Sequence, residues 1–225
     1  MALDPIYKAV GFDMDGTFMD TAVDYEKLAC ATFDTLTGLG VPGGVIVRGG
    51  SSEAENGIGW LKACGRHRDA DEVKSLVSER CTEIEMENVG LAKPFEGSLE
   101  VLKRLVSLGY KVGILTRGGR RYAVSVLGGA GVLDSFDAVV ARDDFPEEEA
   151  KPSPKAMEHL ADAMGVAPAE VLFLGDSLID WLTARDSGSG FYGVLTGGFD
   201  AEDWKNAGRD IPVIDGVRSL LGMLD

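Results

Sequence analysis

Two aspartates one residue apart, Asp13 and Asp15, have the types and spacing best suited to chemistry in this chain. They end an apolar run over residues 7–12 that is typical of a buried strand. Because a strand alternates its side chains between two faces, both carboxylates should leave the strand end toward one small volume. Like charges so close repel unless a positive group lies between them, and a hard divalent cation is the usual such group. The pair indicates a metal or nucleophile site, with a solvated Asp-Gly turn as the alternative.

Short strand-like runs alternate with helical runs along most of the chain. The strands are predicted near residues 7–12, 112–116, 138–141, 171–175, 191–195 and 211–214. Apolar residues between these strands recur at helical spacing, as they do over residues 99–108 and 156–164. This alternation predicts an α/β fold, with a Rossmann-like parallel sheet core and helices on both of its faces.

The stretch over residues 21–90 breaks this alternation. Helices are predicted near residues 25–36, 53–63 and 71–87, with a Gly/Pro-rich segment over residues 38–50. We expect an α-helical domain over residues 21–90, inserted after the first strand. Residues 1–20 and 91–225 would then form the catalytic core.

The residues at the other strand ends test the first motif, because ligands of open parallel sheets bind beyond the carboxyl ends of the strands. The second strand ends in Thr116, and the fourth leads to Asp176 and Asp180. Lys151 lies just ahead of Pro154, a residue that suits the first turn of a helix. More acids, a hydroxyl and a lysine are therefore expected at the same edge as the first acidic pair.

Composition limits the classes of partner. The chain has 225 residues, is 45% hydrophobic and 26% charged, and carries a formal charge of −15. Such an acidic protein is a poor match for nucleic acid or an anionic membrane, whereas a small anionic substrate remains compatible with a locally placed cation. The sequence shows no leader-like segment and no membrane-length apolar run, so a soluble, cytoplasmic protein is expected. The acidic run over residues 147–149 is interpreted as a solvated face.

Cysteine and histidine leave little room for other chemistries. Cys30, Cys64 and Cys81 lack close Cys-x-x-Cys spacing and are expected to be reduced and mostly buried. With only His67, expected in a solvated loop, and His159, neither a histidine metal cage nor a Ser-His-Asp triad is favoured. The chemistry should run on carboxylates, lysine, arginine and hydroxyls.

In this order, the motifs resemble the haloacid dehalogenase-like hydrolase superfamily, and specifically its phosphatases with a helical cap after the first motif. That group includes phosphoglycolate phosphatases and beta-phosphoglucomutase-like proteins. The resemblance rests on the segments 13–21, 94–97, 151–154 and 175–180, and on the strand end at Thr116. It covers nearly the whole chain.

The resemblance implies a reaction through an aspartyl phosphate. Asp13 would be the nucleophile, and Asp15 would protonate the leaving oxygen and then deprotonate the attacking water. Mg²⁺ would be the cofactor, held by Asp13, the backbone carbonyl of Asp15, Asp176 and, directly or through water, Asp180. Phosphate oxygens would be bound by Thr116, the amides of Arg117 and Gly118, and Lys151.

The expected function is hydrolysis of a small phosphorylated metabolite, such as a phosphoglycolate-like compound or a sugar phosphate. Dehalogenases and phosphonate-cleaving members carry Tyr or Ala where this chain has Asp15, and a general acid suits phosphate ester cleavage better. A sugar-phosphate mutase of the same fold is the enzymatic alternative, and a catalytically silent binding or regulatory protein is the other. Arg48 lies where a cap loop is expected and is a candidate for binding a second anionic group of the substrate, with an ordinary surface residue as the alternative.

Overall fold

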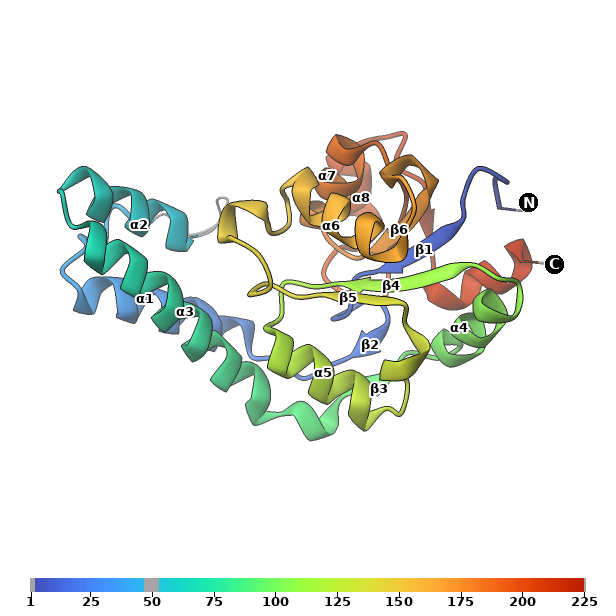
Figure 1. Ribbon diagram of the computed structural model, residues 1–225, viewed down its shortest axis with the longest axis horizontal. Helices are drawn as coiled ribbons and strands as arrows, with labels where there is room; N and C mark the ends of the chain where they lie inside the picture. Colours follow the sequence, from blue (N-terminus) through green and yellow to red (C-terminus); the bar gives the residue numbers. More distant parts are fainter. Residues whose placement is uncertain (1–2, 47–52, 225) are drawn as a thin grey trace. The chain divides into compact units, whose positions relative to one another are not determined.

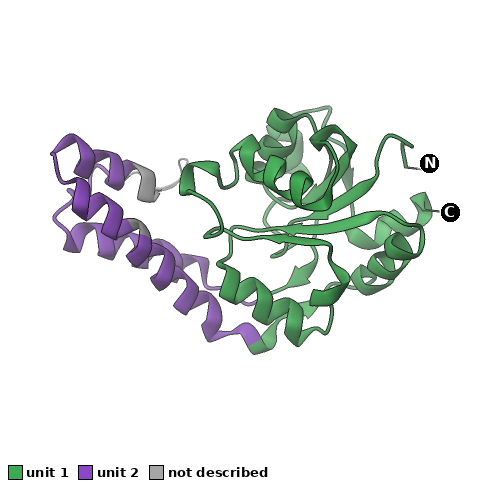
Figure 2. Cartoon of the chain, in the orientation of Figure 1, with its two compact units in different colours: residues 1–21, 90–225 green, residues 22–89 purple. Residues whose placement is uncertain are grey.

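The computed structural model describes residues 3–46 and 53–224, which fall into two compact units. Residues 1–21 and 90–225 form one unit, called the core unit, and residues 22–89 form the other, called the helical unit (Figure 2).

Within the described residues, a six-stranded parallel sheet organises the core unit. The strand order is β5-β4-β1-β6-β7-β8. The strands are β1 Ala9–Phe12, β4 Lys111–Leu115, β5 Ala138–Val140, β6 Val171–Gly175, β7 Gly190–Val194 and β8 Val213–Ile214. Each overlaps a strand expected from the sequence, so the predicted Rossmann-like α/β sheet is confirmed.

Helices cover both faces of this sheet. Figure 1 shows α6, α7 and α8 on one face and α4 and α5 on the other. Their bounds are α4 Ser98–Ser107, α5 Arg120–Gly129, α6 Pro154–Met164, α7 Leu178–Ser187 and α8 Ala201–Ala207. Short 3₁₀ turns lie at Val89–Leu91, Leu133–Ser135, Glu147–Glu149, Pro168–Glu170 and Val217–Met223. No helix in the described part of the chain has the length and apolar character needed to cross a membrane.

The strand order places β1 at the point where the direction of winding reverses. The chain runs outward from β1 through β4 and β5 on one side, and then through β6, β7 and β8 on the other. In an open parallel sheet, such a reversal leaves a crevice beyond the carboxyl ends of the strands beside it. The residues that follow β1, β4 and β6 therefore meet at one edge.

Two paired glycines let α6 lie close to the sheet. Gly11 of β1 is in register with Gly113 of β4, and Leu160 of α6 packs against both. A Cβ at Gly11 would lie 3.0 Å from a Leu160 methyl, and a Cβ at Gly113 would lie 2.8 Å from the other methyl and 2.9 Å from Met164 Sδ. The α6 helix begins at Pro154, as the sequence indicates, with the Ser153 side chain as its cap. This close packing fixes the helix that directly follows Lys151.

A second, two-stranded antiparallel sheet was not expected from the sequence. It pairs β2, Met19–Asp20, with β3, Lys93–Pro94, and Phe95 donates a backbone hydrogen bond to Phe18. The two strands bracket the chain segment that forms the helical unit.

The helical unit contains α1 Tyr25–Gly38, α2 Glu53–Ala63 and α3 His67–Glu87, which agree with the three predicted helices to within four residues. Its core includes the buried side chains of Leu36, Leu61 and Val73. Gly57 gives α2 room against α1, since a Cβ there would lie 2.5 Å from Leu36 Cδ2.

Two expectations for this unit are wrong. Cys30 and Cys64 are exposed and Cys81 is half-buried, because the helices turn these positions away from the small apolar core. His67 is not in a loop but is the first residue of α3, where it remains exposed.

Glycine-to-alanine changes at two positions should have opposite effects on stability. Gly113→Ala should lower the free energy of unfolding by about 1–3 kcal/mol, because the new methyl collides with the enclosed ends of Leu160 and Met164. Gly128→Ala is the matched control: this exposed position in α5 has open space around it, and alanine should stabilise the helix by about 0.5–1 kcal/mol. Urea unfolding followed by circular dichroism measures both, and equal effects would contradict the close packing of α6.

Candidate active site

Three carboxylates gather at the carboxyl edge of the central strands. Asp13 directly follows β1, Asp176 directly follows β6, and Asp180 lies in the first turn of α7. All three are buried, and one oxygen from each lies within 4.8 Å of the others. The sheet thus brings together residues that are more than 160 positions apart in the sequence.

Lys151 reaches into this acidic cluster. Its Nζ lies 2.5 Å from Asp13 Oδ1 and 2.6 Å from Asp180 Oδ1, and its side chain is only 3% exposed. Burial by itself would lower the pKa of Lys151, but the charges of Asp13 and Asp180 outweigh burial and raise it above its usual value. The lysine therefore stays protonated.

Asp180 is held by the helix that carries it. Ser177 donates to Asp180 Oδ2 from its backbone nitrogen at 3.1 Å and from its hydroxyl at 2.6 Å, which forms a capping box at the start of α7. Gly175 makes room for this arrangement, since a Cβ there would lie 2.2 Å from Asp180 Cβ. Asp180 therefore contacts Lys151 through Oδ1 and Ser177 through Oδ2, and so links the lysine to the start of α7.

Asp176 is held by a glycine-rich loop after β7 that the sequence analysis did not single out. Gly198 donates its backbone N–H to Asp176 Oδ2, and Thr17 donates its hydroxyl to Oδ1 at 3.3 Å. A Cβ at Gly197 would lie 2.1 Å from Asp176 Oδ2, so only glycine fits there. A Gly-Gly pair just beyond a strand end is the signal in the sequence that could have indicated this loop.

The electrostatics of the cluster suit a cation. Burial raises the pKa of Asp13 well above its usual value; Lys151 opposes this, and the charges of Asp180, Asp176 and Asp15 add to it. Burial, followed by Asp180, also raises the pKa of Asp176. One lysine does not balance these carboxylates, and a set of converging oxygens with excess negative charge is the kind of site that Mg²⁺ prefers.

Asp15 points to a different set of partners. Its Oδ1 accepts hydrogen bonds from the hydroxyls of Thr21 at 2.8 Å and Tyr122 at 2.7 Å, and Thr116 Oγ1 lies 3.4 Å from its Oδ2. Asp15 is not one of the three carboxylates whose oxygens lie within 4.8 Å of one another, although its charge acts on Asp13. Tyr122 was not identified from the sequence.

The loop after β4 closes on itself. Thr116 is buried, and its Oγ1 accepts the backbone N–H of Gly118 at 2.9 Å. Arg142 supports the loop by donating to the carbonyl of Gly118 from its backbone at 3.0 Å and to that of Arg117 from its side chain at 2.9 Å. The candidate phosphate-binding segment is therefore fixed in shape.

The side chain of Arg117 is committed to the loop that leads to Lys151. It donates to the Lys151 carbonyl at 3.1 Å and to Glu147 Oε1 at 2.7 Å. The expectation of a solvated acidic face over residues 147–149 is wrong for Glu147 and Glu149, since Glu149 bonds His159 with 2.6 Å between its Oε2 and the His159 Nε2. These acids pair with basic side chains 30 and 10 residues away in the sequence, and so anchor the loop.

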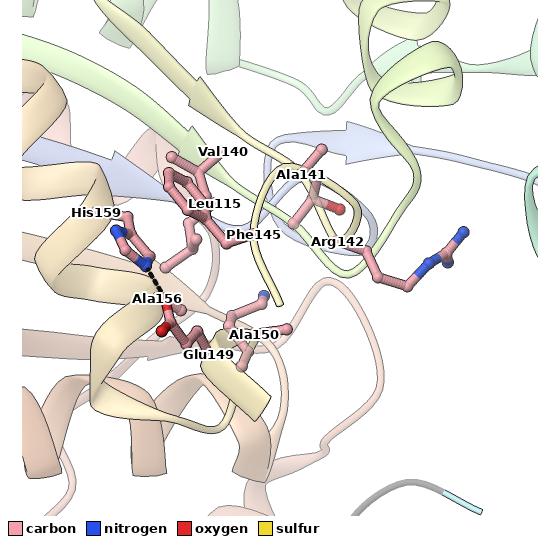
Figure 3. Close-up of a pocket in the computed structure, with 11 residues that line it drawn as sticks. Leu115, Val140, Ala141, Arg142, Phe145, Glu149, Ala150, Ala156 and His159 are labelled. Atoms are coloured by element: carbon pink, nitrogen blue, oxygen red, sulfur yellow. Dashed lines mark hydrogen bonds and ion pairs between the residues drawn. The ribbon is translucent and has the colours of Figure 1, made fainter. Parts of the chain in front are cut away.

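A small pocket lies beside Thr116 and Lys151. Figure 3 shows Glu149 bonded to His159 along its wall, and the ring of Phe145 is stacked on His159 with 3.6 Å between centroids. Its lining comes from three segments, residues 115–116, 140–151 and 156–159. Arg48, the candidate specificity residue, lies outside the described residues.

The chain was compared with known proteins. The family model of the haloacid dehalogenase-like hydrolases matches residues 7–188. A phosphoglycolate phosphatase of Thiobacillus denitrificans is 31% identical over 92% of this chain and 88% of its own. An N-acetylmuramic acid 6-phosphate phosphatase of Pseudomonas aeruginosa is 30% identical over 97% of this chain and 95% of its own.

A solved hydrolase from Pseudomonas syringae has the same fold, with a TM-score of 0.67 and 24% identity over 97% of this chain and 98% of its own. The motifs at the strand ends, the sheet that brings them together and the match over most of the sequence agree. This chain belongs to the haloacid dehalogenase-like hydrolases.

Proposed function

We propose that this protein is a Mg²⁺-dependent phosphatase that hydrolyses a small phosphorylated metabolite through an aspartyl phosphate. The observation that carries the proposal is the buried cluster of Asp13, Asp176 and Asp180 around Lys151, with Asp15 beside it. The family and the two phosphatases similar to this chain support it.

Asp13 is the proposed nucleophile. It is buried at the end of the central strand, and its backbone N–H donates to the carbonyl of Leu174, which fixes the position of its Cα. Lys151 holds one carboxylate oxygen and leaves the other to attack phosphorus. Lys151 would also offset the negative charge that develops on the transferring phosphoryl group.

Asp15 is the proposed general acid and base. Its Oδ1 accepts hydrogen bonds from the neutral hydroxyls of Thr21 and Tyr122, which can hold the carboxyl group in place while it gains and loses a proton. It would give a proton to the leaving oxygen in the first step and take one from water in the second. Thr116 and the amides of Arg117 and Gly118 are proposed to bind phosphate oxygens.

The donor set fits Mg²⁺, with Asp13, Asp176 and the backbone carbonyl of Asp15 as proposed ligands and Asp180 as a further or water-mediated one. When bound, Mg²⁺ would screen the charges of phosphate and Asp13 from each other and polarise the phosphate. Asp180 keeps Lys151 and the start of α7 in place around that site.

The substrate is proposed to be a phosphate monoester of a small acid or sugar. Both similar phosphatases are named for phosphorylated acids, a glycolate and a muramic acid. Residues 21–90 are proposed to form a helical cap that reads the leaving group, and Arg48 remains the predicted residue for a second anionic group.

Mg²⁺ should stabilise the protein in the absence of substrate. At a metal concentration of 100 times Kd, the free energy of unfolding should rise by about 2.7 kcal/mol, because only the folded protein assembles the carboxylates. Asp176→Asn should abolish this rise, whereas Asp162→Asn, at an exposed position of α6, should retain it. Denaturant unfolding with Mg²⁺ or with chelator measures the difference, and an unchanged rise in Asp176→Asn would rule out this metal site.

The two motif aspartates should fail in different ways. Asp13→Asn should form no phosphoenzyme, because an amide is a poor nucleophile. Asp15→Asn should still be phosphorylated by activated aryl esters but turn over about 10²–10⁴ times more slowly. Acid quenching with mass spectrometry detects the phosphoenzyme, and near-normal turnover by either variant would overturn its role.

Release of phosphate should equal loss of substrate over a panel of phosphorylated acids and sugars, and chelation should stop both. A mutase must instead protect its phosphoenzyme from water and return the phosphoryl group to the sugar. Phosphate assay combined with NMR of the products separates the two, and isomerised sugar phosphate with little free phosphate would favour the mutase.

A further inference from the structure

Tyr122 is a buried residue whose hydroxyl is aimed at the proposed general acid. It is the third residue of α5, its side chain is 1% exposed, and its hydroxyl donates to Asp15 Oδ1 at 2.7 Å. Thr21 donates to the same oxygen at 2.8 Å. Two hydroxyl donors on one carboxylate oxygen make Oδ1 an acceptor and fix the plane of the carboxyl group.

The other oxygen of Asp15 faces the candidate phosphate-binding loop. The Thr116 hydroxyl donates to Asp15 Oδ2 at 3.4 Å and accepts the backbone N–H of Gly118 at 2.9 Å. The two shorter hydrogen bonds from Thr21 and Tyr122 hold Oδ1, and so keep Oδ2 directed at the candidate phosphate-binding loop. That oxygen is on the side of Asp15 where phosphate is proposed to bind.

Gly118 makes the position of the tyrosine ring possible. A Cβ at Gly118 would lie 2.8 Å from Tyr122 Cδ1 and 3.2 Å from its Cε1. The ring therefore packs directly against the loop of Thr116 and Gly118. A single arrangement fixes both the phosphate-binding loop and the orientation of Asp15.

We infer that Tyr122 is a positioning residue, which holds Asp15 so that Oδ2 delivers the proton to the leaving oxygen of the phosphate ester. The inference rests on the proposed function. In the first step, Asp13 forms a bond to phosphorus, the bond from phosphorus to the leaving oxygen breaks, and that oxygen takes its electron pair and the proton from Asp15. In the second step, Asp15 takes a proton from the water that displaces Asp13.

The leaving group distinguishes this role from a structural one. An alkoxide is a poor leaving group and needs the proton, whereas 2,4-dinitrophenolate leaves without it. Tyr122→Phe should lower kcat/KM for an alkyl phosphate by about 10- to 100-fold, the effect of losing a hydrogen bond to a charged group. For 2,4-dinitrophenyl phosphate, kcat/KM should change by less than about twofold.

The constant kcat/KM reports on the first step, in which the phosphoenzyme forms. Because kcat/KM includes only steps up to formation of the phosphoenzyme, the later base role of Asp15 does not enter. The ratio of kcat/KM for the two substrates is also independent of how much of the variant is folded, so partial unfolding cannot imitate the result.

Two further variants complete the experiment. Tyr110→Phe removes a hydroxyl at the amino end of β4, the opposite edge of the sheet, and should leave the ratio unchanged. In an Asp15→Asn background, Tyr122→Phe should add no further leaving-group dependence, since the proton donor is already absent.

If Tyr122→Phe lowers kcat/KM equally for both substrates, or changes kcat/KM for neither, the inference is wrong. A wild-type protein that hydrolyses neither substrate with Mg²⁺ would instead refute the proposed function.

Discussion

A single buried lysine among aspartates is the contact on which the rest of the core unit depends. Lys151 bonds both Asp13 and Asp180, which come from different ends of the chain. Removing one partner of a buried ion pair leaves an uncompensated charge, which is strongly destabilising in protein interiors. Around this contact the glycines at 16, 175 and 197 keep Cβ atoms away from Asp176 and Asp180, so that the carboxylates can approach one another. The geometry of the site therefore depends on the space that these glycines leave for the carboxylates as much as on the charges of the carboxylates and the lysine.

The loop that presents Lys151 is held from three directions. Arg117 bonds the lysine carbonyl and Glu147, Glu149 bonds His159 of α6, and Arg120 pairs with Asp144. These partly buried pairs link the candidate phosphate loop, the lysine loop and α6 into one assembly. Arg117, which follows Thr116 in the sequence, thus supports the lysine loop with its side chain, while its backbone carbonyl accepts a hydrogen bond from Arg142.

The sheet and the convergence of residues at its strand ends could be predicted, because each buried strand is a continuous apolar run that ends at a residue of distinct type. Asp13, Thr116 and Asp176 mark three such ends. Because β4, β1 and β6 are neighbouring parallel strands, these ends lie at the same edge of the sheet. The two-stranded sheet of β2 and β3 could not be predicted, since two residues per strand carry no periodicity. The sequence pattern predicts that Tyr122 lies on the buried face of its helix. The partner of its hydroxyl could not be predicted, because it depends on how α5 packs against the strand ends. In the sequence Glu147 and Glu149 look like solvated acids, because a run of three acids carries no sign of the partners, Arg117 and His159, that the fold brings to them.

The two-stranded sheet of β2 and β3 joins the two ends of the segment that forms the helical unit. Asp20 and Lys93 stand opposite each other in register and form an ion pair of 3.3 Å, so the segment between them leaves and re-enters the core unit at neighbouring points. An insertion whose ends are already joined adds little loop-closure entropy with length, and lengthening or replacing it breaks no hydrogen bond of the six-stranded sheet. A lineage could therefore exchange the helical unit while keeping the sheet and the residues at its strand ends, so the inserted unit is freer to diverge than the core unit.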